Sequence, residues 1–384
     1  MNEIVPSMFE VYNRCGNNYP TILQTEGIKK REMQTRTLRF IRLKHTPFGG
    51  AERYLERLES SLKKEGYQTE ILHAQLPKGL PSWLKVLLFD RQICREKSSL
   101  HPPRSILYFS LDRISCPDIY RAGDGVHKAF LETKGFTLNP LHLSYLYLEK
   151  RTFENARCII ANSRLVKEQI LRHYPRIDER KIHIVYNGVP LPGSFDKLRA
   201  KKALAEELAF DPDRPILLFV GSGFERKGVQ EFLQIVSRLR HPIQALIVGK
   251  EKRIGRYKKL AEELGISEHV LFCGPRRDVE RFYEAADLFL FPTRYEPFSN
   301  VVLEALSYEN IVLTTRQNGA SEILPQEWIM QSPEDFGVAS RIDQLLEEPL
   351  LMQQASKTAG EIARRHPLER NVRETLELIQ KQFG

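Results

Sequence analysis

A short glycine-rich segment with two adjacent cations follows an apolar run in the second half of the chain. It reads Gly221-Ser222-Gly223-Phe224-Glu225-Arg226-Lys227-Gly228. Free backbone N–H groups at the start of a helix favour an anion, and a guanidinium beside an ammonium suits a diphosphate. The segment lacks the third glycine of a dinucleotide fingerprint and the lysine of a P-loop. It therefore predicts a different kind of diphosphate site, with a tight turn bearing a solvated basic pair as the alternative.

Two glutamates, Glu296 and Glu304, bracket a second segment, Pro297-Phe298-Ser299-Asn300-Val301-Val302-Leu303. We expect a helix to begin at Pro297, which leaves the N–H groups of Phe298, Ser299 and Asn300 free beside Glu296. Such a corner can hold sugar hydroxyls, and Glu304, more than one turn inside the helix, can accept hydrogen bonds from a ribose diol. Each glutamate alone is more often a surface or helix-end carboxylate. Their spacing, downstream of a diphosphate segment, favours a site for a sugar nucleotide.

Strands and helices alternate along most of the chain, as they do in parallel sheets. Continuous apolar runs predict strands at 216–220, 245–248, 270–273, 288–291 and 311–314. Such runs are typical of strands that helices cover on both faces of the sheet. Further strands are predicted at 38–43, 71–74, 106–109, 157–161 and 182–185, and helices at 51–59 and 165–173. The pattern predicts an α/β fold with two Rossmann-like, doubly wound domains.

Residues 187–193 are rich in turn formers and mark the boundary between the two series of strands. We expect one domain at 37–190 and a second at 191–367, which face each other across a cleft at the carboxyl ends of their strands. The helical stretch 368–384 is predicted to return across that cleft to the first domain. Residues 1–36 show no periodicity and are interpreted as an additional leader, with Met33 as a candidate translation start.

The chain of 384 residues has a net charge of +9, and the whole excess lies in its first half. Residues 1–190 hold 31 Lys+Arg and 20 Asp+Glu, whereas the remainder is net −2. A basic surface attracts phosphate, nucleic acid or an anionic membrane. No recognition motif for nucleic acid accompanies the charge, so we expect no nucleic-acid partner.

The five cysteines are scattered and include no Cys-x-x-Cys pair. This argues against a disulfide framework and a zinc site, and it favours a reducing compartment. No apolar run approaches the ~18 residues of a membrane span, and no signal-peptide pattern is present. These features predict a folded chain in the cytoplasm.

The two chemical segments together resemble the retaining glycosyltransferases of family 4, which have the GT-B fold. Pro47-Phe48-Gly49-Gly50-Ala51-Glu52-Arg53 is similar to the amino-terminal glycine loop of this family, and Asn187-Gly188-Val189 to its interdomain signature. The resemblance covers residues 37–384. Phe48-Gly49-Gly50, Arg121-Ala122-Gly123-Asp124 and Arg151-Thr152-Phe153-Glu154 are most similar to the lipopolysaccharide-core glucosyltransferases that act on heptose. This implies transfer of a hexose, glucose from UDP-glucose, to a lipopolysaccharide-core heptose.

The resemblance implies that the first domain binds the acceptor and the second binds the donor. Gly49 and Gly50 would let the backbone approach the donor diphosphate, while Arg226 and Lys227 neutralise charge on the leaving group. Glu296 and the amides of Phe298, Ser299 and Asn300 would grip the donor sugar, and Glu304 would hold the ribose.

Three further positions belong to the implied site, and two of them depart from the family pattern. Arg276, within Gly274-Pro275-Arg276-Arg277, would edge the nucleobase pocket. Gly223 belongs to a donor loop whose Ser222-Gly223-Phe224-Glu225 departs from the common family pattern. Asp124 stands where many relatives carry a histidine near the transferred sugar. The implied catalytic residues are Asp124, Arg226, Lys227 and Glu296.

In this family the donor bond breaks and the new bond forms on the same face, and a phosphate oxygen of the leaving nucleotide accepts the proton. No carboxylate nucleophile, cofactor or metal is then required. The only Asp-x-Asp, Asp211-Pro212-Asp213, precedes a strand and is interpreted as a turn. The protein would act mainly by electrostatic positioning.

Cations alternate with aromatic residues at 127–151, and Trp83-Leu84-Lys85-Val86-Leu87-Leu88-Phe89 is an apolar patch. Such mixtures suit docking on anionic lipid headgroups, although a solvated face over core residues has equal weight. We therefore expect a lipid-linked glycan acceptor and peripheral association with the inner face of the cytoplasmic membrane.

Three alternatives remain open. The same pocket could serve another nucleotide sugar and a different lipid-linked or capsular acceptor. A sugar-nucleotide epimerase shares the fold, but the additional acid/base residues it needs are not evident. A non-catalytic, nucleotide-sugar-binding scaffold subunit is a third possibility, against which Arg226, Lys227, Glu296 and Glu304 all argue.

Overall fold

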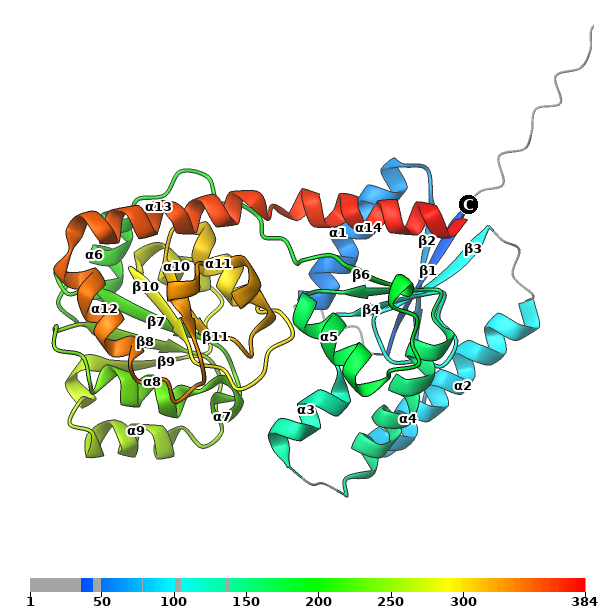
Figure 1. Cartoon of the computed structure of the whole chain (residues 1–384), viewed down its shortest axis with the longest axis horizontal. Coiled ribbons are helices and arrows are strands. Elements are labelled where there is room, and N and C mark those ends of the chain that lie inside the picture. Colours follow the sequence, from blue (N-terminus) through cyan, green and yellow to red (C-terminus); the bar gives the residue numbers. More distant parts are fainter. Residues whose placement is uncertain (1–35, 44–49, 78, 101–104, 136–137, 384) are drawn as a thin grey trace, which may run out of the picture. The chain divides into compact units, whose positions relative to one another are not determined.

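Two parallel β-sheets organise the chain (Figure 1). The computed structural model describes residues 36–43, 50–77, 79–100, 105–135 and 138–383. The first sheet has six strands in the order β2-β1-β3-β4-β5-β6, and the second has six in the order β12-β11-β10-β7-β8-β9. All the pairings described within them are parallel. Residues 1–35 of the predicted leader 1–36, with Met33, lie outside the described residues.

The strands have the following bounds. In the first sheet they are β1 Thr37–Arg42, β2 Gln68–His73, β3 Ile106–Ser110, β4 Ile119–Ala122, β5 Cys158–Ala161 and β6 Ile182–Ile184. In the second they are β7 Ile216–Val220, β8 Gln244–Val248, β9 Val270–Gly274, β10 Leu288–Phe291, β11 Ile311–Thr315 and β12 Ile329–Met330.

The α-helices connect these strands. Around the first sheet they are α1 Gly50–Lys64, α2 Ser82–Leu100, α3 His127–Lys134, α4 Pro140–Asn155 and α5 Arg164–His173. Around the second they are α6 Lys197–Leu208, α7 Phe224–Lys227, α8 Val229–Val236, α9 Ile254–Glu263, α10 Val279–Ala285, α11 Asn300–Ser307, α12 Val338–Glu347 and α13 Pro349–Arg365. The last helix is α14 Leu368–Phe383. The predicted fold class, two doubly wound α/β domains, is confirmed.

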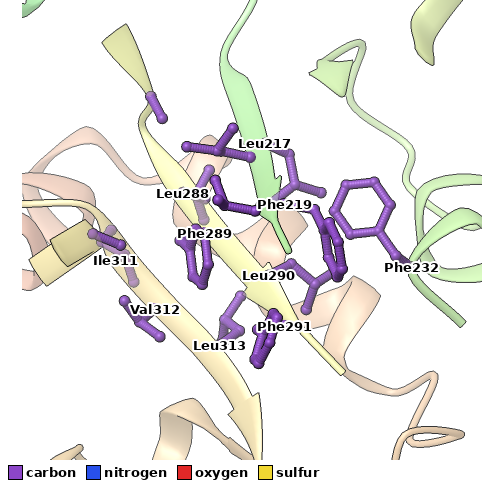
Figure 2. Close-up of a cluster of buried hydrophobic side chains, with 14 of the residues drawn as sticks. Leu217, Phe219, Phe232, Leu288, Phe289, Leu290, Phe291, Ile311, Val312 and Leu313 are labelled. Carbon is purple, nitrogen blue, oxygen red and sulfur yellow. The ribbon is translucent and has the colours of Figure 1, made fainter. Parts of the chain in front are cut away.

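The second sheet is buried on both faces, as its apolar strands require. Every residue of β10 is buried, and its side chains contact Leu217 and Phe219 of β7 and Leu313 of β11 (Figure 2). Phe232 of α8 packs on Phe219 with ring centroids 5.8 Å apart. This continuous core fixes the carboxyl ends of β7 and β10, from which the predicted donor segments extend.

The first sheet buries alternate side chains of β1 on opposite faces, in keeping with the two-residue period of a strand. Leu38 and Phe40 join a cluster with residues of α1 and α14. Ile41 joins a second cluster, with Phe89 and Ile93 of α2. The helices therefore cover both faces of this sheet as well.

The last helix completes the core of the first sheet. Val372, Leu378 and Ile379 of α14 are buried in the same cluster as Leu38 and Phe40. The chain reaches α14 beside the segment that follows β6, where Val189 N–H donates to His366 O (3.1 Å). Leu368 N–H donates in turn to Val189 O (3.1 Å), so the two connections between the sheets are bonded to each other.

Two strands are absent from the elements predicted by sequence. β4 is short and contains Arg121, which interrupts the apolar pattern, and β12 has only two residues. The helix expected at Pro297 begins three residues later, with Ser299 as its N-cap. Phe298 is buried, and its ring centroid lies 5.8 Å from that of Tyr186. Because its side chain packs there, the segment before α11 does not continue the helix.

A disulfide joins Cys94 of α2 to Cys116 of the β3–β4 loop. The expectation that the scattered cysteines argue against disulfides is therefore wrong for this pair. The residues are 22 positions apart in sequence, but α2 packs on the first sheet beside the loop that leads into β4. The spacing of the two cysteines in the sequence does not reveal that they lie close together, because their proximity depends on how α2 packs.

Candidate functional site

A cavity of about 310 Å³, the central cavity, lies where strands of both sheets end. The first sheet contributes Arg42, Arg121, Asp124 and Asn187, which end or follow β1, β4 and β6. The second contributes residues after β7 and β10. Six of the predicted site residues line it: Asp124, Lys227, Glu296, Phe298, Ser299 and Asn300. The carboxyl ends of the strands thus meet at the site, as in other open α/β sheets.

Lys227 is the cation of this cavity that comes from the second sheet. Its ammonium lies 5.2 Å from the centroid of the Phe291 ring. Gly221 makes room for it, because a Cβ atom there would come within 2.6 Å of the Lys227 Cδ. Burial lowers the pKa of Lys227, and Arg226 lowers it further, whereas the carboxylates of Glu296 and Glu304 oppose the shift. The cation therefore occupies a poorly hydrated position, where it acts strongly on an anion.

Arg226 points to Glu296. Its guanidinium donates to Glu296 Oε2 and to the Tyr295 carbonyl, both at 2.7 Å. Arg226 lines two neighbouring cavities but is not among the residues that line the central one. In this structure it therefore orients Glu296, while Lys227 faces the central cavity.

The glycine after this pair has a specific structural role. Gly228 has φ +80°, and a Cβ atom there would clash with the Pro292 carbonyl oxygen. Glycine alone fits both conditions. It ends α7 and begins α8, and so turns Arg226 and Lys227 toward the end of β10.

The predicted anion site at the start of α7 differs from the structure. The helix has only four residues, and the Phe224 N–H donates to Glu251 Oε2 (3.1 Å). The Gly223 N–H donates to the Lys250 carbonyl (3.4 Å). These two amides are occupied by the loop that follows β8, which sequence periodicity does not predict.

The amides at the start of α11 also differ in part from the prediction. The Ser299 N–H donates to Asn318 Oδ1 (3.2 Å) instead of being free. The backbone of Glu296 is held on both sides, because its N–H donates to Gln317 O (3.1 Å) and its carbonyl accepts from Gly319 N–H (2.9 Å). The backbone of this corner is therefore fixed by hydrogen bonds on both sides, and Phe298, Ser299 and Asn300 line the central cavity.

The other predicted site residues either do not line the central cavity or lie outside the described residues. Glu304 accepts from Tyr283 Oη (2.9 Å) and is not among the residues that line the central cavity. Arg276 forms ion pairs with Glu207 (2.7 Å) and Asp278 (2.8 Å) and is likewise not among the lining residues. Gly50 is the first residue of α1, and Gly49 lies outside the described residues.

Asp124 lines the central cavity and a second one of about 330 Å³, the side cavity, which Arg113, His127 and Tyr145 also line. Glu296 lines both as well. Burial, with a further effect of Arg113, lowers the pKa of His127 to about 4, so that this imidazole is neutral near pH 7. The two cavities therefore meet at a pair of carboxylates.

The sequence prediction assigned no role to Arg121 and Asn187, which complete the site. Arg121 lies 4.0 Å above the centre of the Tyr54 ring and donates to Asn187 Oδ1 (2.7 Å). Asn187 Nδ2 donates in turn to Asn300 Oδ1 (2.8 Å). Both residues stand in the segments that carry the family resemblance, but only the fold shows that they form a chain of contacts from one sheet to α11.

Comparison with known proteins identifies the class. Residues 200–364 match the family of group 1 glycosyl transferases, and residues 120–191 match Glycosyltransferase Family 4. These matches include most of the residues that line the central cavity, among them Asp124, Lys227 and Glu296. The chain is a glycosyltransferase with the GT-B fold.

Several relatives take part in lipopolysaccharide synthesis. The chain is 27% identical to the lipopolysaccharide glucosyltransferase WaaG of Escherichia coli over 72% of its own length and 79% of WaaG. It is 29% identical to the lipopolysaccharide core biosynthesis glycosyltransferase LpsE of Rhizobium meliloti, over 51% of each protein. The chain thus spans only about half the length of some of the curated relatives that it matches.

Solved structures share the fold at low identity. A crystal structure of WaaG superposes with a TM-score of 0.71 at 20% identity and covers 89% of this chain and 99% of WaaG. The structure of Anabaena HepE in complex with UDP and glucose has a TM-score of 0.69 at 17% identity, over 90% and 100% of the two chains. The GT-B fold spans most of this glycosyltransferase.

Proposed function

We propose that this glycosyltransferase moves glucose from UDP-glucose to a heptose of the lipopolysaccharide core, with retention of configuration and without a metal. The observation that carries the proposal is the central cavity, which brings Lys227, Glu296 and Asn300 of the second sheet together with Asp124 and Arg121 of the first. Its relatives WaaG and LpsE and the UDP and glucose in the HepE structure support this choice of donor and acceptor.

In this proposal each half of the site acts on one substrate. Lys227 stabilises the negative charge that develops on the leaving diphosphate, and Arg226 keeps Glu296 in position to bind the donor sugar. Glu304, held by Tyr283, is near enough for its charge to raise the pKa of Lys227, and it is proposed to bind the ribose. Asp124 lies between the central and side cavities, where it is proposed to position the acceptor hydroxyl. A phosphate oxygen of the departing UDP accepts the proton.

Among the described residues, no group of three or more His, Cys, Asp and Glu side chains could hold a metal ion. We propose that the ammonium group of Lys227 supplies the positive charge that stabilises the diphosphate, so that the reaction requires no added metal ion.

The test is a screen of UDP-, GDP- and ADP-sugars for hydrolysis and for transfer to a heptosyl acceptor, with and without EDTA. We expect UDP-glucose to be preferred, EDTA to have no effect, and NMR of the product to show an α-glucoside. Preference for another donor, or an inverted product, would contradict the proposal. Binding without turnover of any donor would favour a non-catalytic subunit.

We further propose that the enzyme works on the cytoplasmic face of the membrane. Exposed apolar side chains gather on and beside α2 and α4: Trp83 (38% exposed), Leu138 (75%), Leu143 (55%) and Tyr147 (51%). Cations accompany them, and the Arg151 guanidinium lies 4.9 Å from the Tyr147 ring centroid. Within the described part of the chain, no helix is long and apolar enough to cross a bilayer. A lipid-linked acceptor would be reached from such a surface.

Sedimentation with liposomes tests this docking. We expect pelleting with anionic vesicles, little with neutral ones, and a loss of pelleting at high salt. Exchange of Leu143 and Tyr147 for serine is expected to weaken it, whereas the same exchange at Leu350, exposed on α13, serves as the control. Equal pelleting with both kinds of vesicle would contradict electrostatic docking.

A further inference from the structure

A third cavity, the charged cavity, adjoins the side cavity and has a volume of about 640 Å³. Phe130 and Arg226 line both, so the two cavities are neighbours. One wall is the end of α3, with Thr133 and Lys134. The opposite wall comes from α7, α8 and α9 and includes Arg256. The charged cavity therefore begins beside Arg226 and Glu296 and leads away from them.

Cations outnumber carboxylates in its lining. It contains five cations (Lys134, Arg226, Arg253, Arg256, Arg294) and three carboxylates (Glu225, Glu231, Glu251). A surplus of positive charge in a concave surface attracts anions.

The carboxylates already have partners within the protein. Glu231 is paired with Arg294, and Glu251 accepts from the backbone N–H groups of Phe224 (3.1 Å) and Arg253 (3.0 Å). Glu225 lies 3.9 Å from Arg253. Glu231 and Glu251 are therefore already paired with groups of the protein in the walls of the cavity.

Two cations remain without a carboxylate partner. Among the described residues, neither Lys134 nor Arg256 has a carboxylate within the 4.0 Å of an ion pair. The Arg256 guanidinium donates to the neutral Gln230 (3.1 Å), and the Lys134 ammonium lies 6.0 Å from the Phe130 ring centroid. Lys134 belongs to α3, beside the first sheet, and Arg256 to α9, beside the second, so an anion bound by both cations would contact both halves of the molecule.

The donor diphosphate does not account for this charge, since Lys227, Ser299 and Asn300 line the central cavity and are not among the residues of the charged one. We propose that Lys134 and Arg256 form a subsite for an acidic group of the acceptor, a carboxylate or a phosphate ester next to the sugar that accepts the glucose. This inference rests on the proposed function, because it assumes a glycan acceptor in the side cavity.

Direct binding tests the subsite without turnover. Calorimetry would compare three heptosides: a neutral one, one linked to a sugar carboxylate, and a heptose phosphate. We expect at least one anionic heptoside to bind ~10-fold more tightly than the neutral one, as charged hydrogen bonds allow. Whichever one does so identifies the acidic group.

The variants Lys134→Gln and Arg256→Gln are expected to remove this advantage and to leave binding of the neutral heptoside unchanged. Lys258→Gln, an exposed residue of the same helix α9 outside the cavity lining, is the matched control. Equal affinities for all three heptosides in the unaltered protein, or an advantage that survives in both variants, would overturn the proposal. Failure to transfer glucose in the donor screen, with the binding difference intact, would instead contradict the proposed function.

Discussion

At the scale of single residues, the two adjacent cations of the site have different roles. Lys227 lines the central cavity, whereas Arg226 is bonded to Glu296 and Tyr295. The sequence shows two adjacent basic residues but not this division. It follows from the αL glycine at 228, which fixes the direction in which α7 ends.

Replacement of Lys227 by alanine is expected to lower kcat for transfer by ~10²-fold or more, because a charge contact made to the leaving group in the transition state is lost. The measurement is steady-state transfer, with circular dichroism to show that the fold is retained. Lys258→Ala, exposed on α9, is the control and is expected to leave kcat unchanged. A kcat close to that of the unaltered enzyme would contradict the role given to Lys227.

His127 gives stability a specific dependence on pH. Because burial lowers its pKa from 6.5 to about 4, the folded protein binds fewer protons at this site than the unfolded chain does between these values. The free energy of unfolding therefore rises with pH through this window, by at most ~1.4 kcal/mol per pH unit, and levels off above it.

Urea unfolding at pH 5 and pH 7 measures this effect. His127→Gln is expected to show a smaller rise in the free energy of unfolding than the unaltered protein. His173 and His366, whose pKa values burial also lowers, are present in both proteins and cancel in the comparison. An unchanged rise would mean that His127 is not protected from protons in the fold.

At the scale of elements, sequence periodicity predicts the strands that are buried on both faces. β7 and β10 were predicted with their observed bounds because each is an unbroken apolar run. β4 was missed because Arg121, which its neighbours Tyr54 and Asn187 accommodate, interrupts such a run. The start of α11 was predicted three residues too early, because proline favours the first turn of a helix. In the structure, Phe298 packs on Tyr186 and the helix begins at Asn300.

The candidate site was predictable where its chemistry is local. Glu296 and the residues after it are contiguous, and six of the predicted residues line the central cavity. Arg121 and Asn187 lie 66 positions apart, and the amides of Phe224 and Ser299 are bonded to residues of other loops. Such contacts depend on the packing of whole elements, which spacing along one chain does not encode.

The Cys94–Cys116 disulfide closes a loop that holds α2 against the β3–β4 connection. Such a bond stabilises chiefly by restricting the unfolded chain, by about 3 kcal/mol for a loop of this size. We expect the free energy of unfolding of the oxidised protein to fall by that amount when a reductant is added. The double variant Cys94→Ala, Cys116→Ala is expected to be insensitive to reductant, and a protein that loses no stability on reduction would contradict this.

At the scale of the whole molecule, the stability of the first sheet depends on the last helix. Ile379 is fully buried in the core that contains Leu38 and Phe40. Ile379→Ala is expected to lower the free energy of unfolding by about 2 to 4 kcal/mol, the range for removing such a side chain from a core.

Denaturant unfolding provides the measurement, and Glu377→Ala, exposed on the same helix, is the control. A loss below ~1 kcal/mol for Ile379→Ala would mean that α14 contributes little to the first core. The control is expected to change stability by less than ~0.5 kcal/mol, as is usual for a surface position.

The contribution of α14 also constrains the order of events during synthesis. Domains made first usually fold first, while the ribosome is still extending the chain. Here the first sheet lacks Val372, Leu378 and Ile379 until α14 has been synthesised, so part of its apolar surface stays exposed until then. The second sheet, whose core is contained within 189–363, can fold before the first is complete. A nascent chain stalled after α13 would thus present a folded second sheet and an unfinished first one.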